Sequence, residues 1–194
     1  MRKTRKSLPT RRVFHIVGEG LTELFYFSHL KRLLGYRYAI SPRLFENNSI
    51  EKIEKKIKEL LSEDVLVVCV FDADVSRRSD AENRKMAALK KKYGRNSNVM
   101  LCDSLQSIEY WFLLHFEDTC RHFQDAAATE RALKRYLPTY EKTRKYLERD
   151  GWVRDMIAEG KMTRACELAE KYQGRESYSE IYKAIRRMNE VGPL

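Results

Sequence analysis

Short apolar runs alternate with helical patterns in the first half of the chain. Residues 65–71 (VLVVCVF) are the most apolar segment and are rich in β-branched side chains. A run of this kind, without polar positions, predicts a central strand that is buried on both faces. Residues 13–17 predict another strand, and weaker extended patterns occur at residues 38–44 and 99–102.

Three amphipathic helices are expected between these strands. The first follows the turn Gly18-Glu19-Gly20, with Thr22 placed to cap it and Gly35 placed to end it. The second opens at Ser49, and the third covers residues 80–93. This alternation predicts an α/β fold of Rossmann-like type, in which a mainly parallel sheet is flanked by helices on both faces.

The second half of the chain carries helical patterns only. Pro138 and Gly151 are expected to mark breaks between its helices. We therefore divide the chain into a basic flexible arm at residues 1–12, an α/β domain at residues 13–120, and a helical C-terminal portion at residues 121–194 that packs on it. The helical patterns lie at residues 108–116, 126–136, 140–149, 162–172 and 178–188.

Charge and composition narrow the class of protein. The 194 residues carry a formal net charge of +10, and six of the first twelve residues are basic with no acid among them. Such an arm either contacts phosphates through counterion release or is a solvated terminus. No apolar run reaches the roughly 18 residues that a membrane span needs, and no secretory signal or paired cysteine motif is present. We therefore expect a cytoplasmic protein that does not bind membranes.

Acidic side chains follow two of the predicted strands. Glu19 comes directly after the first strand, and Asp72 and Asp74 follow the buried one. Because carboxyl ends of parallel strands converge at one edge of a sheet, these three carboxylates are expected to meet there. Oxygen ligands of this type suit Mg²⁺ or Mn²⁺. Acids at strand ends are also common as turn formers and helix caps, so each residue taken alone has a structural explanation.

Three motifs together resemble the bacterial RloB-like proteins, which have the TOPRIM fold. They are VGEGLTELFYF at residues 17–27, VFDAD at residues 70–74, and IEYWFLLHF at residues 108–116. The resemblance extends over about residues 13–190. Two positions differ from the usual family pattern: only Leu21 separates the Glu-Gly and Thr-Glu pairs, and residues 104–107 (SLQS) replace a Ser-Asn-Pro segment.

The resemblance implies a Mg²⁺-dependent phosphodiester chemistry on DNA or RNA. Glu19 would then act as an acid or base or as a metal ligand, Asp72 and Asp74 would bind the metal, and Glu109 and Glu23 would complete the site. The resemblance also implies a role in bacterial antiviral defence beside a partner ATPase of the ABC or AAA kind. It leaves the oligomeric state open.

Several of these side chains have a second interpretation from their position alone. Glu23 lies in the first turn of a helix, where the helix dipole favours a carboxylate without any further function. Glu109 stands within an apolar helix and needs a partner, which is either a metal ion or a basic side chain. His115 is expected to be a hydrogen-bonded core histidine rather than a ligand.

Basic side chains suggest contacts with nucleic acid. Arg77 and Arg78 follow the second acidic motif and either grip a phosphate or belong to a solvated loop. The C-terminal portion also places aromatic residues near basic ones, a combination that binds single strands, although helical spacing favours a core role for them. These aromatic residues are Tyr136, Tyr140, Tyr146 and Trp152.

Two other functions compete with a nuclease. The sequence Asp72-Ala73-Asp74-Val75-Ser76 approximates the nucleophile motif of haloacid-dehalogenase-like phosphatases, an interpretation that leaves Glu19 unexplained. Alternatively, the chain is a non-catalytic adaptor whose helical half docks on an ATPase.

Overall fold

A five-stranded sheet forms the centre of the computed structural model, which describes residues 14–18, 20–36, 38–41, 50–63, 65–73 and 79–191. The strand order is β2-β1-β3-β4-β5, and the first four strands are parallel whereas β5 runs antiparallel to β4. The predicted mainly parallel sheet is therefore confirmed. The strands are β1 (Phe14–Gly18), β2 (Tyr38–Ser41), β3 (Leu66–Asp72), β4 (Val99–Leu105) and β5 (Tyr178–Ser179).

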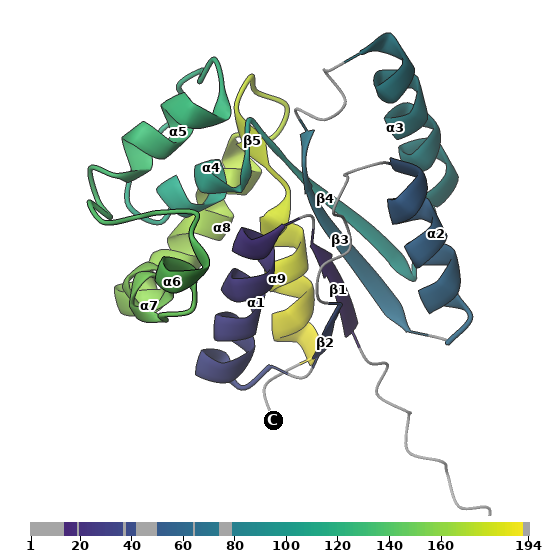
Figure 1. Ribbon diagram of the computed structural model, residues 1–194, viewed down its shortest axis with the longest axis horizontal. Coiled ribbons are helices and arrows are strands. Elements are labelled where there is room, and N and C mark those ends of the chain that lie inside the picture. Colours follow the sequence, from purple (N-terminus) through teal and green to yellow (C-terminus); the bar gives the residue numbers. More distant parts are fainter. Residues whose placement is uncertain are drawn as a thin grey trace, which may run out of the picture.

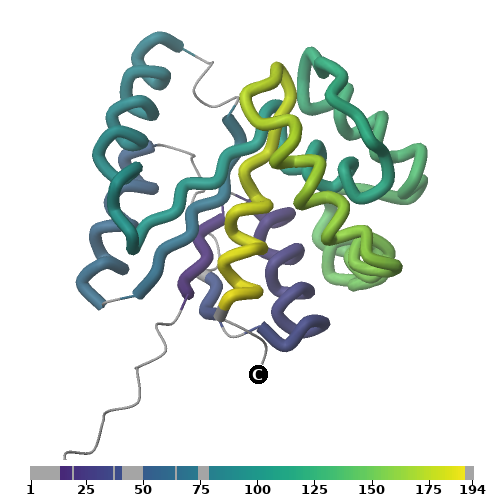
Figure 2. The backbone as a smooth tube through the Cα atoms, turned by 180° about the vertical axis from the view of Figure 1, so that it is seen from behind, coloured from purple at the N-terminus to yellow at the C-terminus, as the bar shows by residue number. Residues whose placement is uncertain are grey.

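Helices cover both faces of the sheet (Figure 1). One face carries α2 (Ile50–Leu61) and α3 (Asp80–Tyr93), and the other carries α1 (Leu21–Leu34) and α9 (Ile181–Val191). The remaining helices extend the second layer away from the sheet, as the view from behind also shows (Figure 2). These are α4 (Ile108–Leu113), α5 (Ala126–Leu133), α6 (Arg144–Leu147), α7 (Gly151–Ile157), the 3-10 helix η2 (Ala158–Gly160) and α8 (Lys161–Lys171).

Strand β3 is buried on both faces, as its sequence predicts. Its side chains alternate between two apolar cores: Leu66, Val68 and Val70 pack in the core under α1 and the C-terminal helices, whereas Val67 and Phe71 pack under α2 and α3. Because successive side chains of a strand point to opposite faces, a strand between two helical layers needs apolar residues at every position.

Buried aromatic side chains join the C-terminal helices to α1. The Trp111 Nε1–H donates a hydrogen bond to the Tyr26 hydroxyl at 2.7 Å, and the Phe112 ring lies 5.0 Å from the Tyr26 ring and 5.3 Å from that of Trp152. Burial of such large rings contributes much of the stability of a core, and the hydrogen bond satisfies the polar indole N–H. The α/β part and the helical portion therefore share one apolar core.

The C-terminal portion differs from the prediction of helices alone. Tyr178 and Ser179 form a short edge strand beside β4, and the helix begins only at Ile181. The hydroxyls of Ser104 and Ser179 lie 2.8 Å apart and are buried, so a polar pair stabilises this edge. A two-residue strand is too short to produce a hydrophobic period, which explains why the sequence pattern did not predict it.

Two local predictions about helices were wrong, and two were confirmed. Gly20, not Thr22, is the residue before the first turn of α1, whereas Gly151 marks a break as predicted, since α6 ends at Leu147 and α7 begins at Gly151. The predicted helix at residues 140–149 is reduced to the short helix α6, because Tyr140 points inward to a buried carboxylate. Gly35 ends α1 in the left-handed conformation that glycine adopts readily, as expected. Ser49 and the basic arm at residues 1–12 lie outside the described residues.

Candidate acidic site

The topological switch point of the sheet lies between β1 and β3. The chain passes from β1 to β2 on one side of β1 and then returns to β3 on the other side. Ligands of open α/β sheets bind outside the carboxyl ends of the strands at such a point. Asp72 is the last residue of β3 and therefore stands at this edge.

Asp72 is partly exposed, and a backbone N–H at the start of α4, the helix that follows β4, binds its carboxylate. Its Oδ1 accepts a hydrogen bond from the backbone N–H of Ile108 at 2.9 Å, at the first residue of α4. A carboxylate at a helix N-terminus is stabilised by the unpaired N–H groups of the first turn. Glu19 directly follows β1, and it lies outside the described residues together with Asp74, Arg77 and Arg78.

Glu23 folds back onto the turn that precedes α1. Its Oε2 accepts a hydrogen bond from the backbone N–H of Gly20 at 2.9 Å, and the residue is 5% exposed. A Cβ atom at Gly18 would lie 2.7 Å from the Glu23 Cβ, so only glycine fits at the end of β1. Glu23 thus packs closely against both Gly18 and Gly20.

Glu109 is completely buried and has three protein partners. The Tyr140 hydroxyl donates to its Oε1 at 2.7 Å, the Ser107 hydroxyl donates to its Oε2 at 2.5 Å, and the Lys142 ammonium lies 3.0 Å from Oε1. The sequence predicted either a metal ion or a basic side chain as the partner of Glu109, and the structure shows a basic side chain, Lys142.

Electrostatic effects link these groups into one acidic cluster, defined as Glu23, Asp72, Glu109, Tyr140 and Lys142. Burial by itself would lower the pKa of Lys142. The negative charges of Glu109 and, to a smaller extent, Asp72 have the larger effect, so the pKa of Lys142 is raised. The pKa of Tyr140 is raised well above its usual range by burial, by Glu109 and by Glu23. At neutral pH, Lys142 is therefore charged and Tyr140 is a neutral hydrogen-bond donor.

The donor set of this cluster is made of oxygens, which is the chemistry that Mg²⁺ and Mn²⁺ prefer. Within the described residues, no group of three or more His, Cys, Asp or Glu side chains is arranged to hold a metal ion. Glu109 is already paired with the Lys142 ammonium, and the described carboxylates Asp72 and Glu23 each accept a hydrogen bond from a backbone N–H. In the sequence, Asp74 follows Asp72 by two positions and Glu19 precedes Glu23 by four.

The family comparison gives a clear match over most of the chain. Residues 14–188 match the family model described as RloB-like protein. The chain belongs to the RloB-like family. Neither the curated proteins nor the solved structures contain a match to it.

In this RloB-like chain, the sequence motifs did not point to Tyr140 and Lys142. The two residues lie 31 and 33 positions after Glu109 in a segment without regular structure, so no periodic pattern connects them with it. An indirect signal was available, since a fully buried glutamate requires hydrogen-bond donors or a cation. That requirement does not say which donors supply them.

The prediction for His115 is confirmed. The imidazole is completely buried, its Nδ1–H donates to the Trp111 carbonyl at 2.9 Å, and burial lowers its pKa to about 4. His115 is therefore a neutral core residue at physiological pH.

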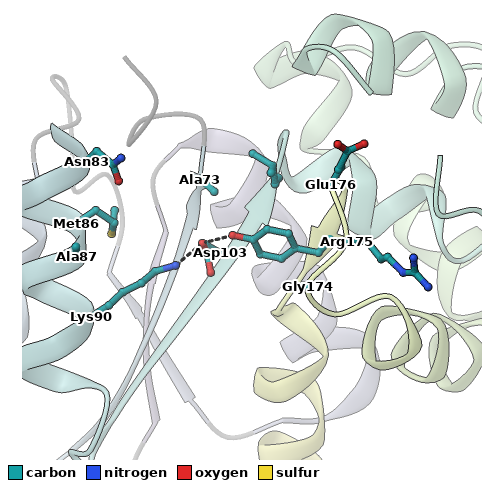
Figure 3. Close-up of a pocket in the computed structure, with 11 residues that line it drawn as sticks. Ala73, Asn83, Met86, Ala87, Lys90, Asp103, Gly174, Arg175 and Glu176 are labelled. Atoms are coloured by element: carbon teal, nitrogen blue, oxygen red, sulfur yellow. Dashed lines mark hydrogen bonds and ion pairs between the residues drawn. The ribbon is translucent and has the colours of Figure 1, made fainter. Parts of the chain in front are cut away.

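A second group of charged side chains lies near the carboxyl end of β4, on the face covered by α3 (Figure 3). The buried Asp103 Oδ2 accepts from the Lys90 ammonium and from the Tyr178 hydroxyl, both at 2.7 Å. Burial and the neighbouring Asp103 raise the pKa of Glu180, whereas hydrogen bonds from Glu180 and Lys90 lower that of Asp103 in spite of its burial. We define Lys90, Asp103, Tyr178 and Glu180 as the Asp103 cluster; apart from Glu180, its members line a cavity of about 460 Å³.

The lengths and apolar character of the described helices show whether any of them could span a membrane. In the part of the chain that the structure covers, no helix combines the length and the apolar character needed to cross a bilayer.

Proposed function

We propose that this RloB-like chain is a divalent-metal-dependent phosphodiesterase of the TOPRIM type that cleaves nucleic acid. The observation that supports this proposal is the position of Asp72. Its partly exposed carboxylate stands at the switch point of the sheet, near the charged Lys142, which also pairs with Glu109. Sites of this location and chemistry bind phosphate-bearing ligands and their counter-ions.

Mg²⁺ or Mn²⁺ would be held by Asp72, Asp74 and Glu19, with Glu23 as a further carboxylate. These residues offer only oxygen donors, which fits a hard cation. A bound divalent cation lowers the pKa of water and neutralises charge that develops on a phosphate oxygen. Glu19 would move a proton as the acid or base of the reaction.

Lys142 and Glu109 have separate tasks in this proposal. Lys142 keeps 41% of its side-chain surface exposed and carries its charge near Asp72, so it can attract and orient a phosphate. Glu109 is a positioning residue, because it fixes the segment of Tyr140 and Lys142 against the start of α4. Arg77 and Arg78 would contact the phosphates of the same strand.

The biological setting follows from the family resemblance. We propose that the chain acts in the cytoplasm, in antiviral defence, with a partner ATPase of the ABC or AAA kind. The helical C-terminal portion would carry the surface for that partner.

The test is a cleavage assay on plasmid, single-stranded DNA and RNA with Mg²⁺ or Mn²⁺. Asp72→Asn and Asp74→Asn should each reduce cleavage at least a hundredfold, because each removes a negative oxygen ligand while keeping the side-chain shape. Asp155→Asn, an exposed carboxylate on α7, is the matched control and should retain full activity.

Three outcomes contradict the proposal. Cleavage that persists in both variants would come from a contaminant. A phosphoaspartate trapped on Asp72 would identify a phosphatase instead. If the chain cleaves no nucleic acid even together with its ATPase, and Asp72→Asn leaves ATPase binding intact, the chain is an adaptor.

A further inference from the structure

The helical C-terminal portion contains a cavity lined by arginines, away from the acidic cluster. The cavity has a volume of about 520 Å³ and lies between the segment that precedes α5 and α5 itself. Arg121, Arg131 and Arg135 line it, and Ala128 and Ala132, one helical turn apart, add only small side chains to its wall. We call it the arginine cavity.

The positive charge of this cavity is only partly compensated. Glu117 pairs with Arg135 at 2.5 Å. Arg121 and Arg131 form no ion pair with any carboxylate among the described residues, and both are exposed. The Arg121 guanidinium is held 4.6 Å from the centre of the buried Phe123 ring, which leaves its N–H groups available at the edge of the guanidinium plane.

Two guanidinium groups without a carboxylate partner among the described residues favour a ligand with phosphate groups. The planar fork of arginine donors matches two oxygens of one phosphate, a geometry that a lysine ammonium does not provide. Small side chains at the cavity wall let a bulky anion approach the helix.

An exposed aromatic ring lies beside one of these arginines, Arg135. Tyr136 keeps 40% of its surface exposed, whereas Tyr140 is buried and Trp152 is 3% exposed. The Arg135 guanidinium lies 5.7 Å from the Tyr136 ring centre, and the Phe116 ring stacks on Tyr136 at 5.4 Å. Basic side chains next to an ordered aromatic ring bind the backbone and bases of single-stranded nucleic acid.

The segment that follows β4 connects the arginine cavity with the acidic cluster through two hydrogen bonds. The Gln106 side-chain N–H donates to the Phe123 carbonyl at 2.5 Å. Gln106 immediately precedes Ser107, whose hydroxyl binds Glu109. The two sites are thus anchored to the consecutive residues Gln106 and Ser107, which follow the carboxyl end of β4.

We propose that the arginine cavity and Tyr136 bind the phosphate backbone of a single-stranded segment of the substrate. The identity of the ligand as nucleic acid rests on the proposed function, whereas the anion site itself stands on Arg121 and Arg131, which have no carboxylate partner among the described residues. Its role is to hold the strand away from the site of cleavage.

The test measures binding in the absence of cleavage, by fluorescence anisotropy of a labelled 20-nucleotide oligo-dT with Asp72→Asn protein. The change is Arg121→Gln combined with Arg131→Gln. Affinity should fall at least tenfold, and the slope of log affinity against log salt should become shallower by about 1 to 1.5, because two phosphate contacts are lost. The matched control is Arg84→Gln with Lys91→Gln, which removes two exposed charges from α3 and should change affinity less than twofold.

A second pair of variants tests the aromatic contact. Tyr136→Ala should weaken binding about fivefold or more, while Tyr136→Phe, which keeps the ring, should bind as the parent does. The inference is overturned if the parent does not bind oligo-dT, if the arginine variant matches its control, or if a polyglutamate peptide of equal charge displaces the oligonucleotide as well as unlabelled oligo-dT does.

These results remain separate from those of the cleavage assay. Normal cleavage that depends on Asp72, with unchanged binding in the arginine variant, removes only the arginine site. Arginine-dependent binding without any cleavage removes only the phosphodiesterase.

Discussion

Two buried carboxylates of this protein, Glu109 and Asp103, are surrounded by the same kinds of side chain. Each accepts a hydrogen bond from a tyrosine hydroxyl at 2.7 Å, and each pairs with a lysine, Lys142 at 3.0 Å or Lys90 at 2.7 Å. Both lie near the carboxyl ends of the central strands. Local chemistry alone therefore does not distinguish a functional group from a structural one.

The two buried carboxylates differ in the second carboxylate that lies near each of them. Near Glu109, the second group is Asp72, which is partly exposed at the switch point. Near Asp103, the second group is Glu180, whose pKa is raised by burial and by Asp103. The protonated form of Glu180 is therefore more favoured than that of a free glutamate, whereas the acidic cluster places the partly exposed Asp72 next to the charged Lys142.

The largest expected effect is on stability. Glu109→Ala leaves the Ser107 and Tyr140 hydroxyls buried without an acceptor, so the free energy of unfolding should fall by about 3 kcal/mol. Asp103→Ala should cost less, because Tyr178 and Lys90 are partly exposed and Glu180 loses an unfavourable neighbour. Urea denaturation measures both. An equal or larger loss for Asp103→Ala would contradict the comparison.

The next largest effect is a difference in cleavage activity between variants of Lys142 and Lys90. Lys142→Met removes the positive charge next to Asp72 and should lower metal-dependent cleavage at least tenfold, because a preorganised charge near the phosphate is lost. Lys90→Met, the matched change in the Asp103 cluster, should lower it less than twofold. Similar losses in both variants would place the two clusters in one functional site.

The tyrosines provide a smaller difference. Tyr140→Phe removes a buried hydrogen bond to a carboxylate and should lower the free energy of unfolding by about 1.5 kcal/mol. Tyr178→Phe should cost about 0.5 kcal/mol, because water can replace the hydroxyl of a partly exposed residue. Thermal melts of the two variants measure this, and a larger cost at Tyr178 would be the contrary result.

The smallest effect is a change in pH dependence. The pKa of Glu180 is raised above its usual value of 4.5, so its contribution to stability is complete below that value and is lost as pH rises through the folded-state pKa. Glu180→Gln keeps a neutral side chain at every pH. Its melting temperature relative to the parent should therefore be higher at pH 8 than at pH 5.

The control for this experiment is Glu167→Gln on α8, an exposed carboxylate outside the cluster. Its difference from the parent should be the same at both pH values. A flat profile for Glu180→Gln as well would show that the Asp103 cluster holds no proton of its own.

Most of the sheet and part of the candidate site follow from the sequence. The alternation of short apolar runs and amphipathic patterns predicted β1 to β4 and α1 to α3, because the periods of strands and helices differ. The same reasoning placed Asp72 at the carboxyl end of a buried strand, where the structure has it. The positions of Glu19 and Asp74 stay predictions, since both lie outside the described residues.

The partners of the buried acids could not be predicted in this way. Tyr140 and Lys142 meet Glu109 from a segment without periodic structure, and Tyr178 meets Asp103 from 75 residues further along the chain. The sequence indicates that a buried glutamate needs a partner, but it does not indicate which residue that partner is. Before the chain folds, every lysine and tyrosine is an equal candidate.

The sequence by itself determined the class of the fold, the strand that forms its centre and the edge at which its acidic motif stands. It did so because burial and backbone geometry impose periods that are visible locally. Only the tertiary structure decided which basic side chains compensate Glu109 and Asp103 and which arginines are left without a partner. Those choices depend on contacts between residues distant in the chain, and such contacts form only when the helical portion packs on the sheet.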